Sequence, residues 1–558
     1  MQTGKSTVKS IFDGTRIFNI PIYQRAYSWK ESNLSDYLTD IINQQLNRQY
    51  FYGTFLFHNN GQRGEFKIID IVDGQQRLTT FLLFMSELLK ILNEKKSNKI
   101  SKRTERIFIK DDDVFKLELS NEDNSFLHNY IFLDQKISQE KIASPSQRLL
   151  LEAKSYFKTE LGKLSVDLLE KIYTTITEAD VLLYVVDEIS EATQIFALLN
   201  DRGRPLTDLE AIKSFLMYNI GLTSKNPNQL IGNIQENFSK IYRLIEKHNL
   251  VEEDILRYHT IAFEHTSKTN SKAYIKGKIS KLVNNNELDK AKVSIMSYCL
   301  RLKETFEVFV EIQDNVENSK RLENFVMLGK VAPFYPLLLN TKKIFPNRFE
   351  ELLSYLNKFV FRATLMRLRS SGDSYINTRL RNKDDAIGIV NEFTQDNWWN
   401  INNRVKASLD YRNYYEWLSK NTVRYILFSY ENKLRENKGY PKLTIKEYFK
   451  TTPNGARFLN IEHITAKKTK GITFDDDFKE NYINNIGNLV IDYIVPNIRK
   501  GNKNTDVKMK EYKQAPLISQ NIIDDTNCDW SNIEDVKLFI NKRESILKKY
   551  INKTFEIE

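Results

Sequence analysis

The chain has 558 residues, of which 41% are hydrophobic and 28% are charged. This length exceeds what one hydrophobic core serves, so we expect two to four domains, and the composition is that of a globular protein. Apolar runs such as 181–186 are far shorter than the roughly 20 residues of a membrane span, and the N-terminus lacks the apolar segment of a secretion signal. Two cysteines, Cys299 and Cys528, exclude a disulfide scaffold and a cysteine-based zinc site. We therefore expect a cytoplasmic protein with no membrane partner.

The charge balance is basic. Lysine and arginine together number 83 against 72 aspartates and glutamates, which gives a net charge of +11 and a pI of about 9.1. A surplus of this size favours an anionic partner, with nucleic acid first. Many basic proteins bind no DNA, so the motifs have to decide.

Three regions differ in their hydrophobic pattern. Residues 1–220 alternate short β-like runs, at 50–57, 66–72 and 179–187, with amphipathic helical segments. Residues 221–440 have an almost wholly helical periodicity. Residues 441–558 return to short strands, at 458–465 and 487–493, before a basic helical stretch at 497–513. The sequence therefore predicts an α+β multidomain protein with a helical middle region.

The segment around Asp73 joins a predicted strand to a predicted helix. A β-branched run ends in Asp73-Gly74 and passes directly into an amphipathic helix that begins near Gln75. Backbone N–H groups at a helix start attract anions, Gly74 permits close approach, and Arg77 in the first turn could hold a phosphate in a bidentate manner. Alternatively, Asp73 caps the helix and Arg77 pairs with it. These residues alone leave both interpretations open.

Two further segments, 20–30 and 196–217, concentrate polar residues between apolar runs, which is more typical of a site than of a plain surface. In the second segment Thr207 and Glu210 have the spacing of a capping box that opens the next helix. The polar residues of interest in the two segments are Gln24, Arg25, Asn200 and Arg202.

Four stretches of the N-terminal region resemble the N-terminal half of the GmrS/GmrD family of modification-dependent (type IV) restriction proteins. They are IPIYQRAYSW at 20–29, YFYGTFLF at 50–57, DGQQRLTT at 73–80 and LNDRGRPLTDLEAIK at 199–213. That half is similar in fold to ParB and sulfiredoxin, whose equivalent motif binds nucleotide phosphates. The resemblance implies binding and hydrolysis of an NTP, either GTP or ATP. It implies a nucleotide-binding or sensing site formed by Asp73, Gly74, Gln75, Gln76, Arg77, Gln24, Arg25, Asn200 and Arg202.

The C-terminal region has one histidine, His463, which lies in the strand-like segment 458–465 directly after Glu462. A second strand-like segment begins near Asn488, and a helix-like stretch carrying Asn497 follows. A strand with Glu-His, a loop, a second strand and a helix bearing asparagine is the ββα layout of an HNH (His-Me finger) nuclease.

Phosphodiester cleavage explains these residue types. A base must deprotonate water near neutral pH, which suits imidazole, and a divalent ion must stabilise charge on the phosphate. Carboxylate and amide oxygens suit Mg²⁺ or Mn²⁺. We therefore assign His463 as the general base, Glu462 and Asn497 as metal ligands, and Asn488 as the residue that orients the imidazole or braces the loop. The alternative is a structural strand histidine with asparagines in turn and cap positions.

This segment also resembles the C-terminal half of the same family. The family pattern runs Glu-His-Ile, then Ile-Gly-Asn-Leu, then two asparagines five residues apart, here Asn497 and Asn502. The family has a proline two residues after Glu-His-Ile, where this chain has Ala466. Contacts with the DNA backbone, which are salt-sensitive and independent of sequence, are expected from Lys467, Lys468, Arg499, Lys500, Lys503 and Asn502.

These features predict an NTP-binding, metal-dependent DNA endonuclease of an anti-phage, modification-dependent restriction system. Its expected parts are a ParB-like nucleotide-binding domain (1–220), a helical coupling region (221–440) and a ββα-metal (HNH) nuclease domain (441–558). Modified phage DNA is the expected substrate, and a homo-oligomer or a defence-system partner protein is left open. Two other classes stay as alternatives: a DNA- or nucleotide-binding regulator with a degenerate nuclease fold, and an NTPase switch that acts on a protein partner.

Overall fold

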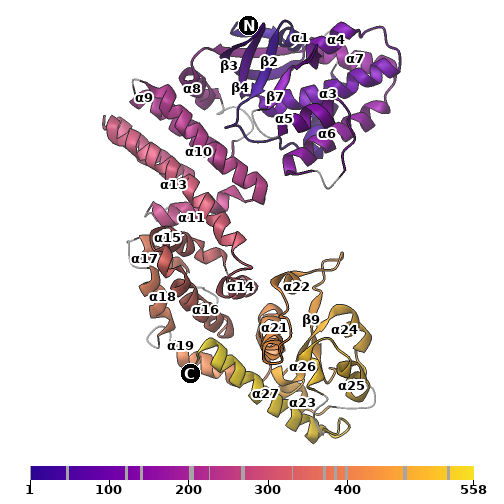
Figure 1. Cartoon of the computed structure of the whole chain (residues 1–558), viewed down its shortest axis with the longest axis vertical. Helices are drawn as coiled ribbons and strands as arrows, with labels where there is room; N and C mark the ends of the chain where they lie inside the picture. Colours follow the sequence, from indigo (N-terminus) through magenta and orange to yellow (C-terminus); the bar gives the residue numbers. More distant parts are fainter. Residues whose placement is uncertain are drawn as a thin grey trace. The chain divides into compact units, whose positions relative to one another are not determined.

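The computed structural model contains two compact units, one formed by Met1–Arg257 with Lys268–Val310 and the other by Tyr258–Ser267 with Glu311–Glu558 (Figure 1). The architecture is α+β, as the sequence predicts. The helical region expected over 221–440 falls partly in each unit. The residues that the structure describes are 2–44, 49–119, 123–138, 142–199, 206–224, 226–264, 270–329, 331–368, 373–381, 386–395, 400–468, 474–523 and 528–557.

A mixed six-stranded sheet forms the centre of the first unit, in the order β1-β8-β3-β4-β2-β7. Strand β3 pairs antiparallel with β4 and parallel with β8, whereas β2 runs parallel to both β4 and β7. The strands are β1 (Gly4–Thr7), β2 (Arg16–Ile20), β3 (Phe51–Arg63), β4 (Phe66–Asp73), β7 (Leu117–Leu119) and β8 (Asp180–Val186). The strands predicted at 50–57, 66–72 and 179–187 are therefore confirmed as β3, β4 and β8.

Helices cover both faces of this sheet because its central strands are apolar on both sides. Phe57 of β3 packs into the main core with α3, α6 and α7, while the neighbouring Leu56 faces α8 on the other side (Figure 1). The principal helices of this unit are α1 (Val8–Phe12), α2 (Glu31–Asn43), α3 (Gln75–Glu94), α4 (Lys102–Phe108), α6 (Pro145–Gly162), α7 (Val166–Thr177), α8 (Ile189–Leu199), α9 (Asp208–Thr223), α10 (Pro227–His248) and α12 (Ser271–Asn284).

The second unit is mainly helical and, in the part of the chain described, contains one antiparallel strand pair, β9 (Leu459–His463) with β10 (Leu489–Tyr493). Helix α24 (Ile494–Lys500) follows β10 directly, so the predicted order of strand, loop, strand and helix is present. The basic stretch 497–513 is divided between α24 and α25 (Thr505–Lys513), because Gly501 leaves the helical conformation at φ 47°. The other principal helices are α14 (Lys320–Met327), α15 (Tyr335–Ile344), α16 (Phe349–Leu365), α19 (Ile401–Asp410), α20 (Tyr414–Trp417), α21 (Lys420–Asn437), α22 (Ile445–Phe449) and α27 (Ile533–Phe555).

Helix α27 approaches the segment that leads into β10 at backbone distance. A Cβ atom on Gly487 would lie 2.2 Å from the carbonyl oxygen of Ile540 and 2.9 Å from the backbone nitrogen of Glu544. No other residue type fits there without a shift of α27, which explains the glycine in the Ile-Gly-Asn-Leu motif.

Replacing Gly487 with alanine is expected to lower the free energy of unfolding of the second unit by about 1–3 kcal/mol, because the added methyl group overpacks the contact with α27. Gly232→Ala is the matched control, since a Cβ on Gly232 in α10 meets nothing within 4 Å. That change is expected to stabilise its helix by about 0.5–1 kcal/mol. Denaturant unfolding of the two variants measures both effects, and an unchanged stability of Gly487→Ala would contradict the steric argument.

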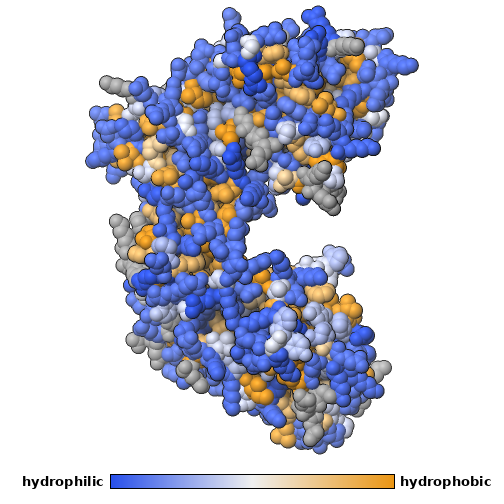
Figure 2. All heavy atoms as spheres, in the orientation of Figure 1, coloured by the Kyte–Doolittle hydropathy of each residue, from blue (hydrophilic) through white to orange (hydrophobic). Residues whose placement is uncertain are grey.

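The surface is polar, in line with a mean hydropathy of −0.49. Hydrophilic residues cover most of the face drawn in Figure 2, and hydrophobic residues there form small separate groups. Within the described ranges, no helix combines the length and the apolar character that a bilayer span requires.

Candidate functional site

His463 ends β9, and its imidazole is held from two sides. Nε2 lies 3.2 Å from Oδ1 of Asn484, and the ring meets Tyr415 edge to face with centroids 4.7 Å apart. Tyr415 is itself fixed, because its backbone N–H donates to the carbonyl oxygen of Asn484 at 3.1 Å. With Nε2 donating to the Asn484 oxygen, Nδ1 is the ring atom that can accept a proton.

The surroundings keep this imidazole uncharged. Burial lowers the pKa of His463 to about 4; the Asn484 hydrogen bond opposes this shift, and the positive charges of Lys467, Lys508 and Lys420 add to it. A histidine with this pKa is neutral near pH 7. Its ring therefore keeps an unprotonated nitrogen at that pH, which is the form in which a histidine acts as a general base.

A basic rim lies beside the histidine. The ammonium groups of Lys420 and Lys467 face the ring of Tyr415 at 3.0 and 4.6 Å from its centroid. Lys467 also pairs with Glu416 at 3.1 Å. Lys468, next in the chain, is exposed. This rim provides positive charge where a phosphate could approach the imidazole.

Glu462 lies on the opposite face of β9 from His463, because side chains alternate along a strand. Its carboxylate is buried, and Oε1 accepts hydrogen bonds from Lys508 Nζ at 2.6 Å and from the Tyr512 hydroxyl at 3.3 Å. Burial raises the pKa of this carboxyl group, and the charge of Lys508 opposes the shift. The second oxygen, Oε2, has no hydrogen-bond partner among the residues described.

Asn497 is the second expected metal ligand, and it lies on α24. Its Nδ2 donates to the carbonyl oxygen of Ile461 at 3.1 Å, which leaves Oδ1 without a partner in the described part of the chain. The open oxygens of Asn497 and Glu462 fit the chemistry of Mg²⁺ or Mn²⁺. The described ranges contain no group of three His, Cys, Asp or Glu side chains able to hold a metal, so water would have to complete the coordination.

Asn488 braces the loop, which is one of the two roles expected for it. The side chain is fully buried; its Oδ1 accepts from the Thr465 N–H at 2.8 Å, and Nδ2 donates to the carbonyl oxygens of Thr465 and Ile483. Asn484 orients the imidazole instead, and the sequence reasoning missed it. The polar pair Asn484-Asn485, placed one short turn before the buried strand β10, is the signal that could have found it.

The basic residues expected to contact DNA differ in their surroundings. Arg499 and Lys503 both pair with Glu511, at 2.9 and 3.4 Å, on an exposed surface. Asn502 is exposed between them in the chain. These side chains are accessible, although the carboxylate of Glu511 offsets part of their charge.

Lys500 does not belong to this surface, which corrects the expectation for it. Its side chain is 1% exposed and pairs with Asp492, itself 3% exposed, at 2.7 Å. Gln520 Nε2 donates to the same carboxylate at 2.9 Å. Lys500 therefore ties α24 to β10 inside the unit and is not placed to meet a DNA phosphate.

In the first unit, two glutamines of the predicted nucleotide site fix the segment that follows β2. Gln24 Nε2 donates to the carbonyl oxygen of Val72 at 2.8 Å. Gln76 Nε2 donates to the Ala26 carbonyl oxygen at 3.1 Å, and its Oε1 accepts from the Ser28 N–H at 2.9 Å. The structure thus brings the Gln24 and Gln76 motifs together at the end of β4 and the start of α3.

Helix α9 contributes two charged side chains, Glu210 and the buried Lys213, to the same place. Arg25 Nε pairs with Glu210 Oε1 at 3.0 Å, and Lys213 Nζ donates to the carbonyl oxygen of Tyr23 at 3.0 Å. Burial lowers the pKa of Lys213 to about 8. The predicted capping box of Thr207 and Glu210 is confirmed by reciprocal hydrogen bonds. Asn200 and Arg202 lie outside the described residues.

The start of α3 is shaped by Gly74, which is the N-cap with φ 91° and has no side-chain cap. Asp73 is therefore not the capping residue; burial raises its pKa, and the charge of Arg77 opposes this shift. The Arg77 guanidinium lies 5.5 Å from the centroid of the Phe55 ring. Gln75 is buried, and its Oε1 has no hydrogen-bond partner in the described ranges.

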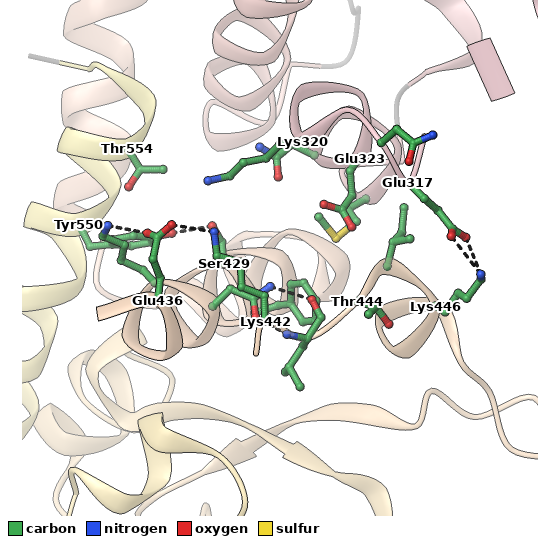
Figure 3. Close-up of a pocket in the computed structure, with 18 of the residues that line it drawn as sticks. Glu317, Lys320, Glu323, Ser429, Glu436, Lys442, Thr444, Lys446, Tyr550 and Thr554 are labelled. Carbon is green, nitrogen blue, oxygen red and sulfur yellow. Dashed lines mark hydrogen bonds and ion pairs between the residues drawn. The ribbon is translucent and has the colours of Figure 1, made fainter. Parts of the chain in front are cut away.

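A separate cavity of about 760 Å³ lies in the second unit among α14, α21, α22 and the end of α27 (Figure 3). Charged residues that line it form ion pairs with one another: Lys442 pairs with Glu436 at 2.7 Å, and Lys446 pairs with Glu317 at 3.0 Å. None of the residues predicted from the sequence lines it. The candidate chemistry is therefore at His463.

Comparison with known families gives a match for the N-terminal part of the chain and another for its C-terminal part. Residues 8–217 match the N-terminal domain, and residues 399–543 the C-terminal domain, of the GmrSD restriction endonucleases. The protein is accordingly a restriction endonuclease, an enzyme whose substrate is DNA. It belongs to the GmrSD family, with the Asp73–Arg77 segment in the first matched range and His463 in the second. A comparison with curated proteins found no match.

Proposed function

We propose that this restriction endonuclease hydrolyses DNA phosphodiester bonds at His463, in a nuclease site of the HNH type. The observation that carries the proposal is a neutral imidazole that is fixed by Asn484 and whose Nδ1 has no hydrogen-bond partner among the described residues. Nδ1 takes the proton from the attacking water. Lys420 and Lys467 draw the DNA phosphate toward the ring.

We further propose that Mg²⁺ or Mn²⁺ is held by Glu462 and Asn497 through the oxygens that make no hydrogen bond in the described part of the protein. When bound, such an ion supplies stabilisation of the negative charge that develops on the scissile phosphate and the leaving oxygen. The charge of Lys508 favours the ionised form of the Glu462 carboxyl group against the effect of its burial, and a metal ligand has to be ionised.

Removal of divalent cations with EDTA is expected to stop cleavage of supercoiled plasmid and of modified phage DNA, and added Mg²⁺ or Mn²⁺ is expected to restore it. Asn497→Ala is expected to raise the metal concentration needed by about tenfold or more, as a ligand is lost. Asn454→Ala, the same change on an exposed residue of the same unit, serves as the control and should behave like the wild type. Cleavage that continues in EDTA would refute metal dependence.

For the N-terminal domain we propose a ParB-like fold that binds and hydrolyses GTP or ATP and gates cleavage of modified phage DNA in the cytoplasm. The support is the start of α3 at Gly74, where no side chain in the described ranges caps the backbone N–H groups, together with the nearby cations Arg77, Arg25 and Lys213. Such a gate would keep the nuclease inactive until the N-terminal domain meets its target. A second copy of the chain or a defence-system protein stays open as a partner.

A further inference from the structure

A hollow of about 420 Å³ lies beside Arg77 in the first unit. This volume is within the range of small-ligand sites. Helix α2 lines one side, because residues three and four apart on a helix share a face. The side chains that the argument uses are Trp29, Asn33, Asp36, Tyr50 and Arg77.

The walls of the hollow are fixed by a buried tyrosine pair. The hydroxyl groups of Tyr37 and Tyr52 are 3.3 Å apart, and the Tyr52 hydroxyl donates to the carbonyl oxygen of Arg77 at 3.1 Å. Trp29 packs edge to face on Tyr37, with centroids 5.9 Å apart. The hollow is therefore preformed, with an indole ring at its wall.

The polar side chains of α2 differ in which of their hydrogen-bond donors and acceptors are already used within the protein. Asp40 is occupied, since its carboxylate accepts from the Tyr50 hydroxyl at 2.7 Å and from Gln44 at 3.1 Å. Asn33 uses Oδ1 to accept from the Lys30 N–H, which leaves Nδ2 as a donor without a partner in the described chain. Asp36 is exposed at the edge of the hollow and makes neither a hydrogen bond nor an ion pair with any residue that the structure describes. The hollow thus presents one open carboxylate next to one open amide donor.

We propose that this hollow holds the base of a guanine nucleotide, an inference that rests on the proposed nucleotide binding. On one edge guanine carries two donors, N1–H and the N2 amino group, beside the acceptor O6. The Asp36 carboxylate accepts from both donors, and Asn33 Nδ2 donates to O6. The ring stacks on Trp29, and Arg77 lies beside it, on the first turn of α3, for the phosphates.

Adenine does not match the same groups. It turns the acceptor N1 toward the Asp36 carboxylate, so that two acceptors face each other and one donor is lost. A site whose acceptor is placed to receive hydrogen bonds from the ligand binds a ligand without those donors poorly, because the acceptor is then left unpaired. The preference therefore follows from the carboxylate rather than from the aromatic wall, which accepts either purine.

Calorimetric titration of the full chain with non-hydrolysable GTP and ATP analogues tests the inference. The wild type is expected to bind the guanosine analogue about tenfold or more tightly than the adenosine analogue. Asp36→Asn is expected to remove most of that preference. Asp167→Asn, the same substitution on the exposed surface of α7, is the control and should retain it.

Tryptophan fluorescence locates the base independently. Binding is expected to change the emission of the wild type, and Trp29→Phe should abolish that change while calorimetry shows an affinity within about twofold, since a phenyl ring still stacks. Equal or tighter binding of the adenosine analogue overturns the guanine inference but leaves nucleotide binding intact. A preference that survives Asp36→Asn, or a signal that survives Trp29→Phe, overturns the assignment to this hollow. Binding of neither analogue overturns the proposed nucleotide function as well.

Discussion

Replacing His463 with alanine is expected to slow DNA cleavage by at least about a hundredfold, because a positioned general base contributes roughly 10²–10⁴ in rate. The imidazole is proposed to act only in proton transfer, whereas Lys420 and Lys467 attract the phosphate. DNA affinity, measured by mobility shift in the same samples, should therefore stay near the wild-type value. Nicking and linearisation of supercoiled plasmid in Mg²⁺ provide the rate.

Two further variants test whether the expected loss of cleavage is specific to the His463 imidazole. Asn484→Ala frees the ring without removing the base, so cleavage is expected to fall by less than in His463→Ala. His248→Ala, in α10 of the other unit, should cleave like the wild type. Equal cleavage by His463→Ala and the wild type would place the nuclease chemistry elsewhere. No cleavage by any of these proteins would favour a DNA- or nucleotide-binding regulator with a degenerate nuclease fold.

Replacing Lys508 with methionine is expected to lower the free energy of unfolding of the second unit by about 3–5 kcal/mol. The reason is burial: the Lys508 side chain is 0% exposed, the Glu462 side chain 6%, and their charged atoms are 2.6 Å apart. Loss of one partner leaves an uncompensated charge in a medium of low dielectric constant. Denaturant unfolding followed by circular dichroism measures the change.

The double variant Glu462→Gln with Lys508→Met separates charge from packing. It should recover much of the lost stability, since neither charge then remains buried. Lys503→Met breaks a solvent-exposed pair with Glu511 and should change stability by less than about 1 kcal/mol. A Lys508→Met protein as stable as the wild type would show that the carboxyl group is already protonated in the folded state.

The secondary structure near the sites followed from local patterns. The apolar runs at 50–57, 66–72 and 179–187 became strands of one sheet, because such runs suit strands that are buried on both faces. The capping box of Thr207 and Glu210 formed as its spacing requires. The order of strand, loop, strand and helix around His463 was likewise readable. Each of these features depends on residues within a few positions of one another.

The partners of the site residues were decided by packing between distant segments. The sequence offered Asn488 either to orient the imidazole or to brace the loop. The fold uses Asn488 for the loop, and Asn484, held against Tyr415 from 69 residues earlier in the chain, for the imidazole. Lys500 was expected on the DNA surface and is buried against Asp492 instead.

The hydrophobic patterns and residue spacings of the chain therefore determined its α+β elements. They did so because helix and strand periodicity and capping are set by neighbours in the chain. Only the tertiary structure decided that Glu462 is paired with Lys508, 46 positions away, and that Asp36 borders a hollow next to Arg77. Burial and ion pairing depend on which surfaces meet after folding, and residue type alone does not encode that choice.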